Sequence, residues 1–200
     1  MLTVHVAAAG RAVLVDGPRV VAVGPYEEVV GERPEARVRR WPGVITPGLV
    51  NVHGPELLEQ AYHPDPRESD ELGTEPVTGA ALDALEMTDA RWGASARRGV
   101  QRMLAHGTVA AAGELQNRAV LDAVRRAGLT LTGRARRPDG VPALDPFASG
   151  GPVLWAPGLN PGTAARFAVF DVPDESALAE HGAATCVATV IAGRLVYRRR

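Results

Sequence analysis

The segment Gly43-Val44-Ile45-Thr46-Pro47-Gly48-Leu49-Val50-Asn51-Val52-His53 carries more information about the fold than any other part of the sequence. A Pro-Gly turn leads there into a continuous apolar run over 49–52, and His53 follows at once. A run that does not alternate between apolar and polar residues is typical of a strand buried on both faces, as strands of parallel sheets are. We therefore predict a buried parallel strand over 49–52.

The segments before this run are predicted to form a meander of short strands. Apolar or alternating runs cover 4–8, 12–15 and 20–23, and they are separated by Gly10 and by Asp16-Gly17-Pro18. Gly, Pro and Asp are residues that turns favour, and Asp-Gly between two apolar runs is a strong hairpin signal. The second and third runs are therefore expected to be antiparallel neighbours.

After His53 the pattern changes to helices that alternate with strands. The segment 63–78 is rich in Pro, Asp, Glu, Arg and Ser, and we expect an exposed loop there. Apolar residues recur at helical spacing over 89–104, with Asp89 as the expected N-cap, and over 117–128. A short apolar strand over 108–112 lies between these helices, which is the rhythm of a parallel β/α unit. The chain closes with short predicted strands over 167–170, 186–191 and 195–197.

Composition and charge exclude several classes of protein. All 22 residues counted as Lys or Arg are arginine, which excludes a phosphate-binding loop with its lysine, a Schiff-base lysine and a metal-bridging carbamylated lysine. The formal net charge is −1 and the arginines are spread along the chain, so no nucleic-acid partner is expected. Cys186 is the single cysteine, and no apolar run is long enough for a membrane helix. We expect a cytoplasmic protein with no membrane partner.

Four blocks of sequence, taken in their order along the chain, resemble one family. They are residues 20–24 with the motif 46–53, the segment 103–109, the segment 160–171 and the final hairpin around 191–194. Together they resemble the amidohydrolase superfamily, and within it the imidazolonepropionase-like members. In that family a small β-sandwich precedes a barrel whose first strand reads Pro-Gly-Leu-Val-Asp-x-His-x-His.

The resemblance implies a mixed α/β fold in which both chain ends build one domain. We expect a small composite β-sandwich over 1–48 and 158–200. About a hundred residues separate His53 from Asn160, whereas a closed (β/α)8 barrel needs roughly 200–250. The region 49–157 is therefore expected to be a truncated, unclosed barrel remnant of about two β/α units.

The resemblance also implies a metal site, of which this chain retains one family-matched ligand. Side chains alternate along a strand, so the family's two histidines share one face, but here the second position is Pro55 and only His53 remains. Asn51 stands where the family has an aspartate. A catalytic zinc generally needs three protein ligands and an open position, so His53 alone does not supply such a site.

His63 and His106 are the other histidines from which a metal site could be rebuilt. Ligands converge at the carboxyl ends of barrel strands, so a zinc or iron site of His53, His63 and His106 is one hypothesis. The alternatives are a solvated loop residue for His63 and, for His106, a cation at the carboxyl end of a helix.

Three functions are compatible with these observations. The first, favoured by the lost ligands, is a degenerate, non-catalytic protein without a cofactor that serves binding or assembly. A second copy, forming a homodimer, or another protein would cover the open barrel edge. The second is a metal-dependent hydrolase of a non-peptide C–N bond in a small cyclic amide or heterocycle. The third is an accessory subunit in a pathway such as histidine degradation or aminofutalosine deamination.

Overall fold

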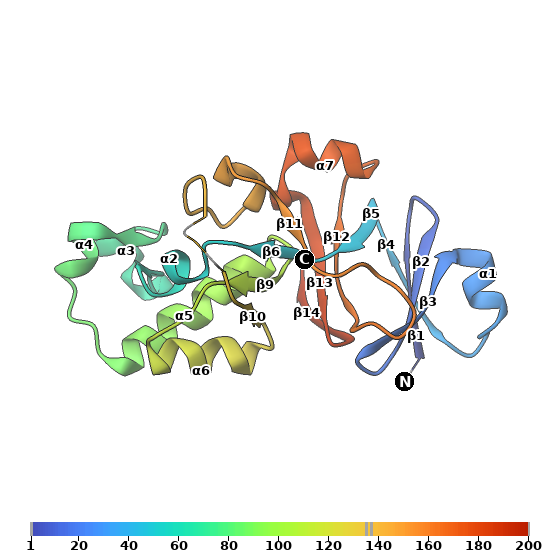
Figure 1. Ribbon diagram of the computed structural model, residues 1–200, viewed down its shortest axis with the longest axis horizontal. Helices are drawn as coiled ribbons and strands as arrows, with labels where there is room; N and C mark the ends of the chain where they lie inside the picture. The colour runs from blue at the N-terminus through green and yellow to red at the C-terminus, as the bar shows by residue number, and fades with distance from the viewer. Residues whose placement is uncertain (1, 135, 137, 200) are drawn as a thin grey trace.

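The computed structural model describes residues 2–134, 136 and 138–199, and it contains three four-stranded sheets and one two-stranded sheet. Two of the large sheets lie face to face at one end of the molecule, and the third, with its helices, forms the other end (Figure 1). The predicted sandwich bounds 1 and 200 fall on residues outside the described ones. The other predicted domain boundaries, at 48 and 158, stay predictions.

The first sheet is the predicted N-terminal meander. Its order is β3-β2-β1-β4, with β1 (Leu2–Ala7), β2 (Arg11–Asp16) and β3 (Arg19–Pro25) antiparallel and β4 (Arg37–Trp41) parallel to β1. The antiparallel hairpin predicted at Asp-Gly is thus confirmed. The short helix α1 (Tyr26–Gly31), which the sequence pattern did not indicate, packs apolar side chains against the outer face of this sheet.

The second sheet joins the two ends of the chain. Strands β5 (Val44–Pro47), β12 (Arg166–Phe170), β13 (Cys186–Ile191) and β14 (Arg194–Arg198) are all antiparallel, in the order β14-β13-β12-β5. One face packs on the first sheet through a shared apolar core, so the predicted composite β-sandwich is confirmed. This core contains Ala7, Val13, Val15, Val20, Trp41, Ile45, Phe167, Val169, Ala188 and Val190.

The third sheet corresponds to the predicted barrel remnant. Its order is β10-β9-β6-β11, in which β6 (Leu49–Asn51), β9 (Thr108–Ala112) and β10 (Thr130–Thr132) are parallel. The two-residue strand β11 (Leu154–Trp155) pairs antiparallel with β6. Among the described residues this sheet has two free edges and does not close into a barrel, as expected. The predicted parallel strand after the Pro-Gly turn is also confirmed.

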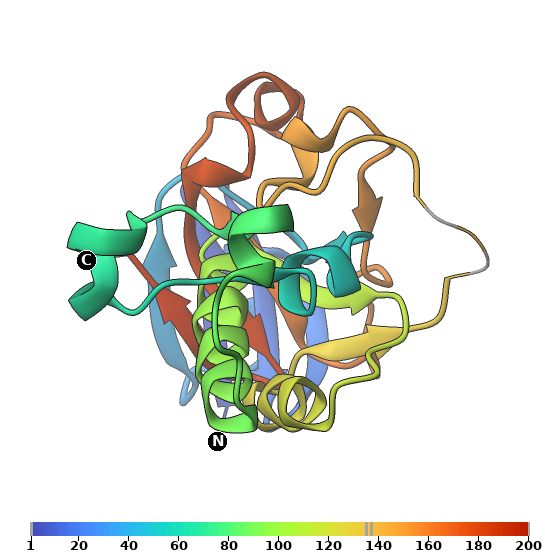
Figure 2. The same ribbon diagram turned by 90° about the vertical axis from the view of Figure 1, so that its left-hand side faces the viewer.

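Two helices lie side by side along this sheet (Figure 2), and their boundaries agree closely with the sequence. Helix α5 (Asp89–Leu104) has Thr88 as its N-cap, because the Thr88 hydroxyl accepts a hydrogen bond from the backbone N–H of Arg91. The predicted N-cap at Asp89 is therefore wrong by one position. Helix α6 (Arg118–Ala127) has Asn117 as its N-cap and ends at Gly128 with φ 76°, where a left-handed backbone favours glycine.

The segment 63–78, expected to be an exposed loop, is held at both ends. Strand β7 (Ala61–Tyr62) pairs with β8 (Val77–Thr78), and a 3-10 turn (Pro66–Glu68) and α3 (Ser69–Leu72) lie between them. Much of the segment is exposed, but its first residue is buried. The segment is thus exposed over much of its length, and it contains short elements that the sequence pattern did not indicate.

Polar contacts with helix α5 explain why this segment is ordered. The buried Tyr62 hydroxyl donates to Glu68, and the Arg91 guanidinium stacks 4.7 Å above the Tyr62 ring while it donates to Glu68 over 2.9 Å. Arg98 donates from Nε to the carbonyl of His63 over 2.8 Å and pairs with Asp65. The many charged residues of this segment favoured the prediction of an exposed loop, but several of them form ion pairs and hydrogen bonds with α5.

The remaining helices connect the sheets. Helices α2 (Gly54–Leu58) and α4 (Gly79–Asp83) lie at one end of the third sheet, and α7 (Glu175–His181) crosses from β12 to β13.

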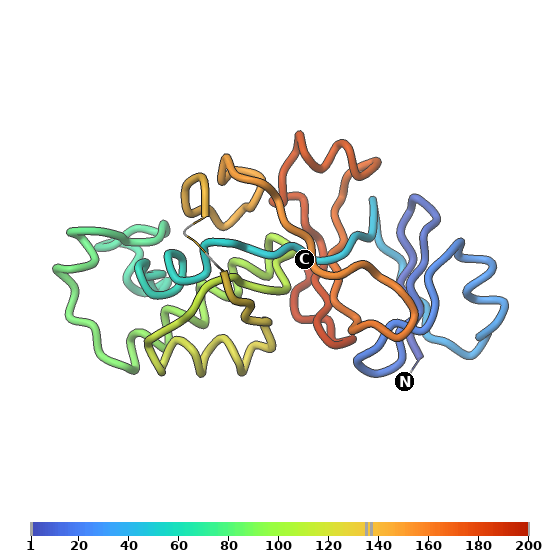
Figure 3. Tube along the Cα trace, viewed as in Figure 1, coloured from blue at the N-terminus to red at the C-terminus, as the bar shows by residue number. Residues whose placement is uncertain are grey.

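The second sheet is buried on its other face too, because an apolar cluster there joins Phe170 and Cys186 to Leu49. The chain enters the third sheet directly from β5 and returns through 156–165 (Figure 3). In the described part of the chain, no helix is long and apolar enough to span a membrane.

Candidate functional site

The carboxyl ends of the parallel strands meet at one edge of the third sheet, which we call the carboxyl edge. His53 follows β6, Gly113 follows β9 and Arg134 follows β10. In parallel α/β sheets the loops at this edge are where ligand sites form. The carboxyl edge is therefore the candidate site, and helix α2 begins there.

A bidentate ion pair links two of the strand ends. Arg134 donates from Nη1 to Oε2 of Glu56 over 2.9 Å and from Nη2 to Oε1 over 2.7 Å. The same Nη1 donates to the carbonyl of Val52 over 2.9 Å. The Glu56 side chain is 8% exposed and the Arg134 side chain 23%. Planar two-bond pairing of this kind is strong and directional, so it fixes α2 against the end of β10.

The ion pair sets the protonation state of Glu56. Burial by itself raises the pKa of this carboxyl, but the hydrogen bonds from Arg134, a backbone bond and the guanidinium charge together hold the pKa below its ordinary value of 4.5. The same pairing raises the pKa of Arg134. Both groups are therefore charged at neutral pH.

Position 55, where the family has its second histidine, is filled by a packed ring. Pro55 is buried in the first turn of α2, and a Cβ at Gly113 would come within 2.5 Å of the Pro55 ring. A Cβ at Gly54 would come within 2.9 Å of the Ala112 carbonyl oxygen. The start of α2 thus touches the end of β9 without a gap.

His53 is buried at this edge, and Asn51 fixes its backbone. The Asn51 side chain accepts the backbone N–H of His53 over 3.0 Å and donates through Nδ2 to the carbonyl of Ala143 over 2.8 Å. An aspartate could accept the first bond but could not donate the second. The asparagine therefore ties the loop around Ala143 to the strand end.

His63 lies in the core beside α5. The residue is 1% exposed, and Nε2 stands 2.8 Å from the carbonyl oxygen of Leu57, so Nε2 carries the proton. Burial lowers the pKa of His63. Its backbone N–H donates to Ser95. The alternative of a solvated loop residue is wrong, because the chain folds this side chain inward against Gly99.

His106 lies at the opposite end of the third sheet from His53. It follows α5 and precedes β9, and its Nδ1 stands 2.8 Å from the carbonyl oxygen of Arg102 in the last turn of that helix. Since β6 and β9 run parallel, a residue before β9 and a residue after β6 occupy opposite edges. The structure does not bring His53, His63 and His106 together.

The residues at the carboxyl edge do not fit a catalytic metal. His53 has Glu56 nearby, but both oxygens of that carboxylate are bonded to Arg134. A dication beside Glu56 would face the positive charge of the guanidinium. Within residues 2–134, 136 and 138–199, no group of three His, Cys, Asp or Glu side chains is arranged as a metal site.

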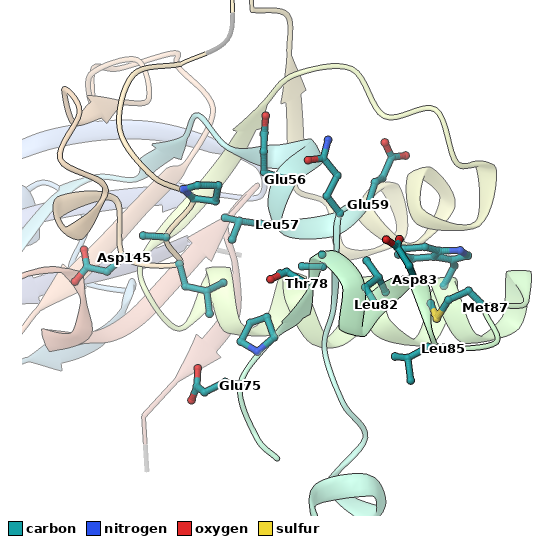
Figure 4. Close-up of a pocket in the computed structure, with 18 of the residues that line it drawn as sticks. Glu56, Leu57, Glu59, Glu75, Thr78, Leu82, Asp83, Leu85, Met87 and Asp145 are labelled. Atoms are coloured by element: carbon teal, nitrogen blue, oxygen red, sulfur yellow. The ribbon is translucent and has the colours of Figure 1, made fainter. Parts of the chain in front are cut away.

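A large pocket of about 1060 Å³ borders the carboxyl edge (Figure 4). Helix α2 supplies Glu56 and Leu57 to its wall, and α4 supplies Leu82 and Asp83. Its acidic residues are Glu56, Glu59, Glu75, Asp83 and Asp145, and its larger apolar ones are Leu57, Leu82, Leu85, Met87, Trp92 and Leu144.

Several of these carboxylates hold the backbone in place. Glu59 accepts the backbone N–H of Asn117 over 2.6 Å, which fixes the start of α6 to α2. Asp145 accepts the backbone N–H groups of Phe147 and Ala183, each over 2.9 Å. Glu75 is largely exposed and stands 3.7 Å from Arg102. The pocket walls therefore depend on these acids structurally.

Sequence reasoning located His53 but missed Arg134. Arg134 lies shortly after β10 (Thr130–Thr132). A strand is expected after the second helix because helices and strands alternate here, but β10 is only three residues long and its sequence shows no clear strand pattern. Recognising this strand would have placed an arginine at the carboxyl edge. Glu56 lies three residues after His53 in the sequence, and no local pattern there indicates a pairing with Arg134.

No protein-family model and no curated protein matches the chain. Solved structures that resemble it include ochratoxinase from A. niger (16% identity, TM-score 0.43, 66% of this chain and 31% of that one). Guanine deaminase from Bradyrhizobium japonicum (17%, 0.39, 67% and 30%) is another. A third is N-isopropylammelide isopropylaminohydrolase from Burkholderia multivorans (18%, 0.43, 66% and 37%). The chain spans about a third of the length of each of these proteins.

Proposed function

We propose that this chain is a non-catalytic, amidohydrolase-like protein that serves binding or assembly. The observation that carries the proposal is the Glu56–Arg134 ion pair, which stands at the carboxyl edge beside the one family-matched histidine. A guanidinium that occupies both carboxylate oxygens supplies there the positive charge that a metal ion would otherwise provide. Releasing Glu56 for a metal would leave Arg134 partly buried without its partner.

Position 55 supports the same proposal. A histidine ring there would have to replace a proline that packs against Gly113. His53 therefore has no histidine two residues on, and one ring nitrogen each of His63 and His106 faces a backbone carbonyl. Three ligands and an open position, as catalytic zinc requires, are not provided by these residues.

For assembly we propose that a second copy covers the edge of the third sheet at β11. Both residues of this strand are large and apolar, and both are exposed, Leu154 at 45% and Trp155 at 41% of their surface. The outer side of β11 has no neighbouring strand among the described residues. Edge strands pair readily, and two copies of one strand can meet antiparallel across a twofold axis, which makes the contact self-complementary.

Size-exclusion chromatography with light scattering tests this proposal. The wild-type protein should be a dimer, and Trp155→Arg should be a monomer because it places a charge in the contact. Val21→Arg, at an apolar residue of the first sheet that is 37% exposed, is the matched control and should stay dimeric. His53→Ala should also stay dimeric. A monomeric wild type, or a dimeric Trp155→Arg, would refute the assembly role.

The alternative function is metal-dependent hydrolysis of a non-peptide C–N bond in a small cyclic amide or heterocycle. Its support is the position of His53, which is buried at the edge where barrel enzymes place their ligands. Zinc or iron bound in a fixed ratio, and lost in His53→Ala, would favour this alternative. We also propose a cytoplasmic location, because Cys186 is the single cysteine of the sequence and cannot form an internal disulfide.

A further inference from the structure

A second, smaller cavity lies between the third sheet and the returning segment 156–166. Its volume is about 290 Å³. Small and apolar residues make up most of its wall, and one side chain in it carries a charge, Arg166. The lining residues are Val50, Val109, Ala110, Thr130, Thr132, Ala156, Pro157, Thr163, Ala164 and Arg166.

Arg166 has no carboxylate partner in the part of the chain that the structure describes. It is the first residue of β12 and is half-buried, and its one side-chain hydrogen bond there runs from Nη1 to the carbonyl of Val109 over 3.5 Å. Burial lowers the pKa of its guanidinium. A partly buried charge that is neither paired nor well hydrogen-bonded costs free energy.

Three other partly buried arginines of the chain are paired, whereas Arg39 lies near Arg37 and Arg198 on another part of the surface. Arg134, Arg91 and Arg98 have side chains 23%, 27% and 24% exposed, and each contacts a carboxylate within 3.3 Å. Arg166 differs from these three, and it forms part of the wall of an apolar cavity. A guanidinium in that position can accept the anionic group of a ligand.

We propose that this cavity binds a small molecule with an apolar body and a terminal carboxylate, and that Arg166 holds the carboxylate. A guanidinium presents two parallel N–H donors that match the two oxygens of a carboxylate. The walls formed by Val50, Ala110 and Pro157 suit an aliphatic or aromatic body. The hydroxyl of the exposed Thr132 is a further donor at the rim.

Isothermal titration calorimetry with matched probes tests the proposal. Octanoate and benzoate should bind, whereas octan-1-ol and benzyl alcohol, which keep the apolar body but lack the charge, should bind roughly tenfold more weakly or not at all. Arg166→Gln should weaken octanoate binding by roughly tenfold or more. Arg166→Lys, which keeps the charge but loses the paired donors, should lie between Arg166→Gln and the wild type.

Two further variants separate the cavity from the general charge of the surface. Arg194→Gln removes an exposed arginine of the same sheet and should leave the affinity unchanged. Ala164→Leu fills the cavity from an exposed position and should weaken octanoate binding without lowering the melting temperature. In the absence of probe, Arg166→Gln should melt at or above the wild-type temperature, because no ion pair is lost.

Three results would overturn the proposal. One is that neither carboxylate binds; another is that the alcohols bind as tightly as the acids. The third is that Arg166→Gln binds octanoate like the wild type, or melts well below it, which would make Arg166 a structural residue. These outcomes do not depend on the metal content of the protein.

Discussion

The two charged side chains at the carboxyl edge give the clearest test at the scale of single residues. Glu56→Gln should destabilise the protein by about 3 kcal/mol, because it leaves Arg134 partly buried and unpaired. Adding Arg134→Met should recover much of this loss, since an apolar pair in place of a buried ion pair is often close to neutral. Urea unfolding of the wild type, both single variants and the double variant measures the coupling.

The pH dependence of this difference follows from the lowered pKa of Glu56. Its contribution to stability is complete above the ordinary carboxyl pKa of 4.5 and is lost as the pH falls through the lower pKa of the folded state. The gap between wild type and Glu56→Gln should therefore be constant near neutral pH and shrink in acid. A gap that widens in acid would show that Glu56 is protonated in the native state.

Pro55→His introduces the second histidine of the motif that the sequence resembles and should not create a metal site. The buried proline ring touches Gly113, so the larger imidazole should cost about 1–3 kcal/mol. Unfolding and zinc content measured on the same sample check this expectation. A stable variant that retains zinc would show that the edge can still accommodate a metal.

How much of the site the sequence could predict depends on whether a residue acts alone or in a pair. The position of His53 follows from the motif, because the Pro-Gly turn and apolar run place it at a strand end. Arg134 and Glu56 are 78 residues apart in the chain, and only tertiary packing brings them together. The burial of His63 likewise depends on a tertiary contact, because its ring packs against Gly99. From the sequence alone, Gly99 is only a residue with low helix propensity within a predicted helix.

At the scale of elements, two glycines of α5 make opposite predictions for the same substitution. Alanine at Gly99 would put Cβ 2.6 Å from Nε2 of the buried His63, so Gly99→Ala should destabilise by about 1–3 kcal/mol despite its better helix propensity. Alanine at Gly93 would have its nearest contact at 3.6 Å, so Gly93→Ala should be neutral or stabilise by up to about 1 kcal/mol. Chemical unfolding compares the two, and equal effects would contradict the packing of His63 on α5.

The elements that sequence patterns predict are those whose ends carry local signals. Helix α6 begins after the N-cap Asn117 and ends at Gly128, which adopts the left-handed conformation. Asparagine at an N-cap and glycine at a helix end can both be recognised from the sequence. Strand β11 and helix α1 were missed, because two exposed residues and a six-residue helix have no period long enough to detect. Their positions are set by the sheets on which they pack.

At the scale of the whole molecule, the sandwich and the third sheet share their cores. One apolar cluster joins Ile191 of the second sheet to α5 and α6, and another joins Phe170 to Leu49. We therefore predict that the two ends unfold together. A variant with Trp41 as its one tryptophan reports on the sandwich, and a variant with Trp92 alone reports on the pocket end. Their fluorescence transitions in urea should coincide, whereas separate midpoints would show independent domains.

The measurement that tests the central claim most directly is the zinc stoichiometry of the purified protein. Wild type and His53→Ala are dialysed against zinc and then against metal-free buffer, and zinc per chain is determined by mass spectrometry. With Arg134 bonded to both oxygens of Glu56, both proteins should retain far less than one zinc ion per chain. One zinc ion per wild-type chain, absent from His53→Ala, would contradict the claim that an ion pair stands in place of the metal centre.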